Sequence, residues 1–223
     1  MPSDPRRVPS VACLLYLAAD QLIPRTMSAT MLKATKVPCR PIWVHPIRLS
    51  ATITAATLLS LREAGRLQLH LQDMTSKDPT YKLPPGRLRT HTTLTLTVAA
   101  ADPAPSDGLA GVLLAMTRDL PDGLLGEFQA NGRLVDLVGL PDGAIAYPFV
   151  RNLVRTELLD TGYYTRSQRF RVQPDCQQIA TLEHTRNEMV RWWEHQQATE
   201  PRLCAALLAV CRRASIPLTG GGG

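Results

Sequence analysis

The sequence predicts a mainly α-helical fold, with a helical core bundle and short β-hairpins and amphipathic helices around it. Hydrophobic residues make up 44% of the 223 positions, which allows a substantial core, whereas aromatic residues make up 5%. The apolar residues are mainly Leu, Ala and Val, and this composition favours helix packing over a β-sandwich. We therefore expect a single helical domain over residues 1–219, followed by a flexible glycine tail over 220–223.

The first half of the chain shows two helical patterns and two strand patterns. Ser10 is a plausible N-cap for a helix over 11–19, and Ser50 for a second helix that Gly65 ends. Four prolines between residues 20 and 48 predict irregular structure there. The period-two alternation of GRLQLHL, and of THTTLTLTV at 90–98, predicts strands on either side of a polar loop over 73–90.

The second half is expected to alternate between helices and turns. Helical patterns cover 108–118 and, more briefly, 123–130, and a strand is expected over 133–138. Pro148 suits the first turn of a helix that runs to about Asp160 and ends at Gly162. A polar-tipped hairpin over 162–173, a long amphipathic helix over about 176–198 and a final helix opened by Pro201 complete the prediction.

The cysteine pattern predicts free thiols. The five cysteines are an odd number and form no CxxC pair, which indicates a reducing, cytoplasmic compartment without a disulfide framework. Cys13, Cys204 and Cys211 fall within apolar helical patterns, where cysteine behaves as a small buried hydrophobe. The apolar run over 11–19 is too short to span a bilayer, so we expect any membrane contact to be peripheral.

Positive charge gathers in one acid-free segment. The chain has a net charge of +6 from 25 basic and 19 acidic residues, and no acidic residue occurs between Gln21 and Arg62. A local positive field attracts nucleic acid or acidic lipid, and the alternative is a solvated loop without a partner. The six basic residues of this segment are Arg25, Lys33, Lys36, Arg40, Arg48 and Arg62.

No catalytic or cofactor motif occurs in the sequence. GxGxxG, GxxxxGK[ST], HExxH and GxSxG are all absent. His184 and Glu188 are four residues apart, which suits a surface pair better than a metal site that would need further ligands. We therefore expect a binding protein rather than an enzyme, with no cofactor and no metal.

Trp43 is the aromatic residue that most suggests a binding role. It lies in PCRPIWVHPIR, between Arg40 and Arg48. A loop tryptophan beside arginine suits a membrane interface, where the ring enters the headgroup layer and arginine binds phosphate. The alternative is that Trp43 packs beneath its own loop.

Several segments resemble the Golgi phosphoprotein 3 family of peripheral membrane proteins. ACLLYLAAD is similar to the family's first helix, ITAATLLSLREAGRLQL to its helix followed by a GRLEL-like strand, and VRNLVRTELLDTGYYT to its basic helix, glycine stop and hairpin start. The tryptophan pair at 192–193 and RLCAALLAVCRRASIPL follow in the family's order. The resemblance covers about residues 11–217, and the Arg-rich, Lys-poor composition fits a divergent member from a high-GC bacterium.

This resemblance implies binding of phosphatidylinositol 4-phosphate or another anionic lipid by an adaptor or scaffold. The family's headgroup site uses a loop tryptophan, an arginine at the start of the second helix and basic residues on a later helix. Trp43 corresponds to the loop tryptophan, and Arg151 corresponds to one of the basic residues on the later helix. Arg48 lies near the position of the second-helix arginine. With the neighbouring Arg155 of the later helix, we expect a site made by Trp43, Arg48, Arg151 and Arg155.

Two alternatives remain open at this point. The helix over 148–160 and the hairpin with Arg166, Arg169 and Arg171 resemble a winged helix in outline, which would bind nucleic acid. Nucleic acid is less favoured because Glu157 and Asp160 lie on the would-be recognition helix. The hairpin over 162–173 could instead bind a protein partner or mediate self-association by edge pairing.

Overall fold

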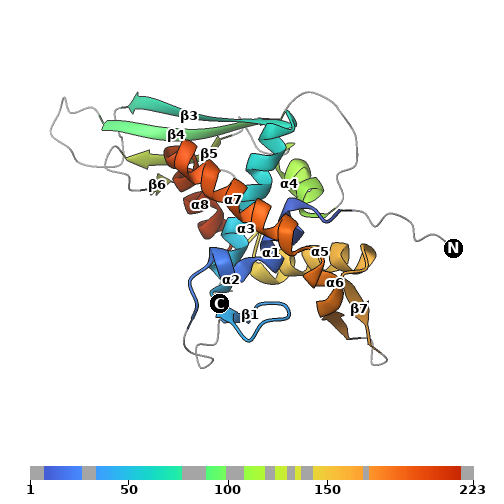
Figure 1. The fold of residues 1–223 in the computed structure, drawn as a ribbon. Coiled ribbons are helices and arrows are strands. Elements are labelled where there is room, and N and C mark those ends of the chain that lie inside the picture. The colour runs from blue at the N-terminus through green and yellow to red at the C-terminus, as the bar shows by residue number, and fades with distance from the viewer. Residues whose placement is uncertain are drawn as a thin grey trace, which may run out of the picture.

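The computed structural model describes residues 8–26, 34–76, 89–98, 108–118, 124–129, 134–136, 143–167 and 171–216. These ranges hold eight helices and eight strands, and all the strand pairs are antiparallel. The mainly helical prediction is confirmed. In Figure 1 a four-stranded sheet lies along one side of the helices, and β1 and β7, from two small hairpins, lie at the opposite end. The predicted glycine tail over 220–223 lies outside the described residues.

Helix α3 (Pro46–Glu63) forms the centre of the core. Twelve of its 18 residues are buried, and it packs against α1 (Val11–Leu17), α4 (Gly108–Arg118), α5 (Tyr147–Asp160) and α8 (Pro201–Ala214). The predicted start at Ser50 is wrong, because Pro46 occupies the first turn, where its missing N–H costs nothing. Ser50 is instead buried, and its hydroxyl donates to the Ile145 carbonyl oxygen at 2.7 Å.

The N-terminal helix is fixed to α5 by polar contacts. The Ser10 hydroxyl accepts a hydrogen bond from the Cys13 N–H at 3.4 Å, which confirms the predicted cap. The Ser10 N–H and hydroxyl also donate to the Glu157 carboxylate at 2.7 and 2.9 Å. Helix α1 is almost wholly buried and leads directly into the short α2 (Ala19–Leu22).

The four-stranded sheet is larger than the sequence predicts. Its order is β3 (Leu67–Ser76), β4 (Arg89–Val98), β5 (Leu124–Gln129) and β6 (Leu134–Asp136). The helical piece expected over 123–130 is wrong, since this stretch pairs with β4 as a strand. The loop expected from residue 73 begins too early, because β3 stays paired with β4 through Ser76 opposite Arg89. Cross-strand pairing overrides weak local preference in both cases.

The C-terminal part follows the prediction with one break. Helices α5 and α8 have close to the expected bounds, and β7 (Tyr164–Arg166) pairs with β8 (Val172–Pro174) as the predicted hairpin. The long helix expected over 176–198 is two helices, α6 (Cys176–Ala180) and α7 (Glu183–Thr199). The Asp175 carboxylate caps α6 by accepting from the backbone N–H groups of Gln177 and Gln178.

The expectation of no disulfide is wrong. Cys39 and Cys176 are bonded across 137 positions, whereas Cys13, Cys204 and Cys211 are free and buried, as expected. Cys39 lies in the turn between β1 (Thr35–Lys36) and β2 (Trp43–Val44), and this hairpin folds back onto the start of α6. No spacing in the sequence signals a pair so far apart. None of the described helices is long and apolar enough to cross a bilayer.

Candidate functional site

A cleft of about 450 Å³ lies where the β1–β2 hairpin, α5 and the β7–β8 hairpin meet. This volume suits a small ligand or a headgroup. Among the described residues, its lining carries three basic side chains and no carboxylate. The polar and aromatic members of the lining that matter here are Tyr16, Lys36, Trp43, Arg151, Arg155 and Tyr164.

One face of α5 supplies the two arginines. Arg151 and Arg155 are four residues apart and therefore lie on the same side of the helix, one turn and two turns after Tyr147. The adjacent face, with Val150, Val154 and Leu158, is buried in the core. Phe149, which the apolar pattern groups with that core face, is instead 41% exposed. Burial of the valine and leucine stripe thus fixes both guanidinium groups toward the cleft.

Each arginine lies over a tyrosine ring. The Arg151 guanidinium carbon is 5.7 Å from the centroid of the Tyr147 ring, and that of Arg155 is 5.8 Å from the Tyr164 ring. Contacts within about 6 Å are favourable cation–π interactions. Arg155 also donates to the Val172 carbonyl oxygen of β8. In the described part of the chain nothing accepts from the buried Nε of Arg151.

Three tyrosines form a polar floor beside the arginines: Tyr16 and Tyr164 line the cleft, and Tyr147 lies under the Arg151 guanidinium without lining the cleft. Burial raises the pKa of Tyr164 to about 12, and it raises the pKa values of Tyr16 and Tyr147 further above the ordinary tyrosine range. Tyr16 and Tyr164 share a hydrogen bond, and the Tyr147 hydroxyl lies 2.5 Å from the Thr35 hydroxyl. The three phenols are therefore neutral at physiological pH, and Tyr16 hydrogen-bonds to both of the others.

The β1–β2 hairpin brings an exposed indole and an exposed ammonium group to the rim. Lys36 and Trp43 are register partners across the hairpin. Trp43 is 39% exposed, so it does not pack beneath its own loop. An indole half in solvent beside basic groups is the arrangement found at membrane interfaces.

Three of the four predicted site residues meet in this cleft. Trp43, Arg151 and Arg155 line it, whereas Arg48 is exposed on the first turn of α3 and is not part of the lining. Sequence reasoning missed the tyrosine floor. The four-residue spacing from Tyr147 to Arg151 was a usable signal for one tyrosine, while Tyr16 and Tyr164 lie far apart in the chain and gave none.

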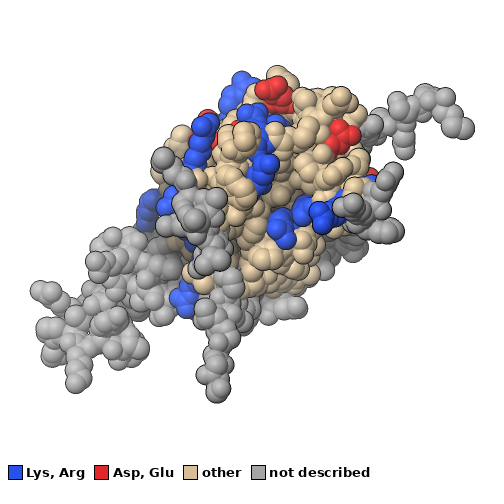
Figure 2. All heavy atoms as spheres, turned by 90° about the horizontal axis from the view of Figure 1, so that it is seen from below, with Lys and Arg blue, Asp and Glu red and all other residues tan. Residues whose placement is uncertain are grey.

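The positive charge of the acid-free segment is partly compensated. Figure 2 shows the end of the molecule seen from below, with separate Lys and Arg side chains and few acidic ones. Of the acid-free segment, Arg40 pairs with Asp20 at 3.1 Å, and Arg62 pairs with Glu200 at 2.5 Å. Segments distant in sequence therefore supply acids that the linear charge count does not reveal.

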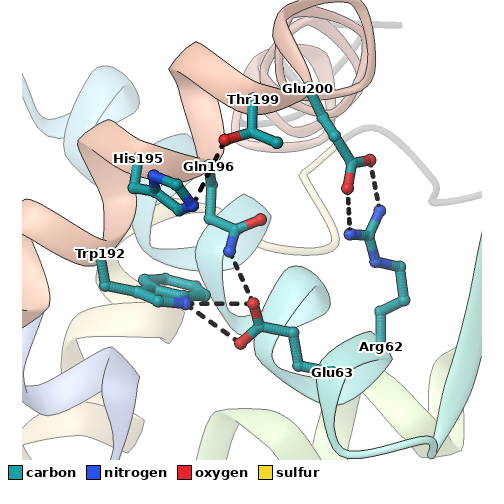
Figure 3. Close-up of polar contacts among 7 residues, drawn as sticks. All are labelled: Arg62, Glu63, Trp192, His195, Gln196, Thr199 and Glu200. Atoms are coloured by element: carbon teal, nitrogen blue, oxygen red, sulfur yellow. Dashed lines mark hydrogen bonds and ion pairs between the residues drawn. The ribbon is translucent and has the colours of Figure 1, made fainter.

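A second polar cluster joins α3 to α7 and α8 (Figure 3). Arg62 donates two hydrogen bonds to the Glu200 carboxylate, at 2.6 and 2.5 Å. Glu63 accepts from the Trp192 indole N–H and from the Gln196 amide, the latter at 2.6 Å. These polar groups are hydrogen-bonded to one another, and they hold the C-terminal end of α3 against α7 and α8. Their role is therefore structural.

The remaining candidates for chemistry do not assemble into a site. His184 and Glu188 form the expected exposed pair at 3.2 Å, and over the described ranges no three His, Cys, Asp or Glu side chains are placed to hold a metal ion. Comparison with protein-family models, curated proteins and solved structures yields no match to this chain. The geometry of the cleft is therefore the basis for a functional inference.

Proposed function

We propose that this protein binds membranes peripherally, with an anionic lipid headgroup in the cleft formed by Trp43, Arg151 and Arg155. The observation that carries the proposal is that segments distant in the sequence converge on one cleft. An exposed indole and three basic side chains from segments more than 100 residues apart line one cleft, and none of the lining residues that the structure describes is a carboxylate. Arginine forks are donors suited to phosphate oxygens.

The charges of the cleft are sufficient for useful recruitment. Each basic group near an acidic bilayer contributes roughly 1 kcal/mol, so Lys36, Arg151 and Arg155 together contribute about 3 kcal/mol. Insertion of the Trp43 ring into the headgroup layer would add apolar burial. Peripheral proteins commonly require two such signals together.

The finer parts of the proposal rest on the family resemblance. A Golgi phosphoprotein 3-like protein would prefer a phosphoinositide headgroup and would act as an adaptor or scaffold at a cytoplasmic membrane surface. Arg48 would then contact lipid from outside the cleft, since it is exposed on the neighbouring α3. Protein binding or self-association through the hairpin over 162–173 is compatible with this proposal.

The test is sedimentation with vesicles that differ only in their anionic lipid, including phosphatidylinositol 4-phosphate, phosphatidylserine and a neutral control. Wild-type protein should bind one anionic headgroup in physiological salt. The double variant Trp43→Ala/Arg151→Ala should lose this binding. A matched double variant, Phe149→Ala/Arg191→Ala, removes an exposed aromatic ring and an exposed arginine outside the cleft and should retain it.

The outcomes separate the cleft from a generally basic surface. Equal loss in both double variants would mean that net charge and exposed rings, rather than the cleft, hold the protein to the membrane. Unchanged sedimentation of Trp43→Ala/Arg151→Ala, or no binding by the wild type, would refute the proposal. A duplex-DNA mobility shift at low salt in a wild type that ignores vesicles would favour the winged-helix alternative.

A further inference from the structure

The cleft is closed on one side by a covalent bond between two of its walls. Cys39 lines the cleft from the turn of the β1–β2 hairpin, and Pro174, two residues before Cys176, lines it from β8. The disulfide thus joins segments 137 positions apart at the edge of the site. Trp43 belongs to the same hairpin as Cys39, so the bond restrains the wall that carries the exposed indole.

We propose that the Cys39–Cys176 disulfide is a redox modification site, and that its reduction by a dithiol loosens the hairpin wall and weakens ligand binding in the cleft. The weakening of lipid binding rests on the proposed function, whereas the loosening of the wall does not.

Access favours this pair over the other cysteines. Cys39 and Cys176 are both exposed to solvent, whereas Cys13, Cys204 and Cys211 are buried. Burial also raises the pKa of each free thiol, that of Cys211 to about 12. Because exchange requires a reachable sulfur and an attacking thiolate, the buried thiols neither react readily nor reshuffle with the pair.

The exchange is a balanced two-electron step. One thiolate of the dithiol attacks a sulfur of the pair and forms a mixed disulfide, and the second thiol of the dithiol then displaces the protein sulfur. The protein gains two electrons and two protons as two thiols, while the dithiol is oxidised to its own disulfide. The reaction is reversible, so the wall can be closed again.

The backbone at Cys39 gives the hairpin a reason to relax. Its φ is +58°, in the left-handed region that side chains with a Cβ adopt unfavourably. Loss of the bond removes one constraint that holds this conformation. The hairpin keeps the Arg40–Asp20 ion pair and the Thr35–Tyr147 hydrogen bond, so we expect local loosening and a reduced protein that remains folded.

The first test measures the bond and the wall without lipid. Purified full-length protein is denatured and alkylated before and after treatment with dithiothreitol. Mass spectrometry should count three reactive thiols before reduction and five after it. The emission assigned to Trp43, taken as the difference between wild type and Trp43→Phe, should shift to longer wavelength on reduction, because the loosened ring becomes more hydrated.

The second test measures vesicle binding by the same samples. Reduction should weaken binding to phosphatidylinositol 4-phosphate vesicles about tenfold, because the ligand must then reorder the hairpin side chains. Reoxidation should restore it. The variant Cys39→Ser/Cys176→Ser should resemble the reduced protein and ignore dithiothreitol. Equal binding and unchanged Trp43 emission after full reduction, or five thiols before it, would overturn the inference. A wild type that binds no vesicle yet shows the emission shift would refute the proposed function alone.

Discussion

The salt dependence of single charge removals should separate the interior of the cleft from its rim. Lys36 is exposed, whereas the Arg151 guanidinium lies over the Tyr147 ring with its Nε buried. Each cation contributes roughly 1 kcal/mol near an acidic bilayer, and about 1.4 kcal/mol corresponds to a tenfold change in affinity. At low salt we expect Lys36→Ala and Arg151→Ala each to weaken binding about fivefold.

High salt should make these two variants diverge. The Debye length falls from about 10 Å at 0.1 M to about 3 Å at 1 M, and exposed charges are screened far more than partly buried ones. The deficit of Lys36→Ala relative to wild type should therefore disappear in about 1 M salt. That of Arg151→Ala should persist, because Arg151 is half-buried and its guanidinium lies over the Tyr147 ring.

The assay is vesicle sedimentation across a salt series, with Arg191→Ala as the matched control for charge. Arg191 is exposed on α7 and its Nε donates to the Asn187 carbonyl oxygen of its own helix, so its removal changes net charge and leaves the cleft intact. Arg191→Ala should weaken binding less than either cleft variant at low salt, and less than Arg151→Ala at every salt concentration. Parallel salt curves for Arg151→Ala and Arg191→Ala would refute the assignment of Arg151 to the cleft interior.

Three predictions concern stability and are measured by chemical denaturation. Leu59→Ala, in the fully buried face of α3, should lower the free energy of unfolding by about 2–5 kcal/mol; a loss below about 1 kcal/mol would mean that the surrounding core collapses into the space. Ser10→Ala removes the cap of α1 and a donor to Glu157, so a loss of about 1–2 kcal/mol is expected, and Ser10→Thr should recover most of it. Pairing with Arg62 lowers the pKa of the Glu200 carboxyl. The stability that this ion pair contributes is therefore present above the ordinary pKa of about 4.5 and is lost as pH falls through the lowered value. Because Glu200 is 38% exposed, wild type should lose no more than about 1 kcal/mol relative to Glu200→Gln between pH 6 and pH 3, and no difference would mean that the pair is only a surface contact.

The helical frame was predictable because its signals are local. The Ser10 cap, Pro148 in the first turn of α5 and the Gly162 stop mark boundaries that the structure keeps within one or two residues. The same local reasoning failed for β5, where a six-residue stretch with an internal glycine becomes a strand because β4 offers it partners. Pairing with a distant strand leaves no trace in the periodicity of so short a segment.

The cleft was predictable in part, for a related reason. Trp43 and Arg151 were predicted from the family resemblance, and the four-residue spacing that places Arg155 on the same helix face can be read from sequence. The bond between Cys39 and Cys176, and the approach of Tyr16 to Tyr164, depend on how the chain returns to the same place after more than 130 residues. Such contacts follow from the packing of the whole domain and not from any local pattern.

The exposure of Trp43 follows from the burial of its neighbour. In a strand, successive side chains point to opposite faces, and Val44 is fully buried while Trp43 is 39% exposed. Pro46 begins α3 two residues after Val44, so the central helix of the core fixes which of the two strand residues faces inward. An apolar side chain in the core thereby directs an apolar ring into solvent, beside Lys36. Exposing an apolar ring to water costs free energy, and such exposure is expected where the ring serves binding. The position of the core helix α3 thus determines the exposure of the ring at the rim of the cleft.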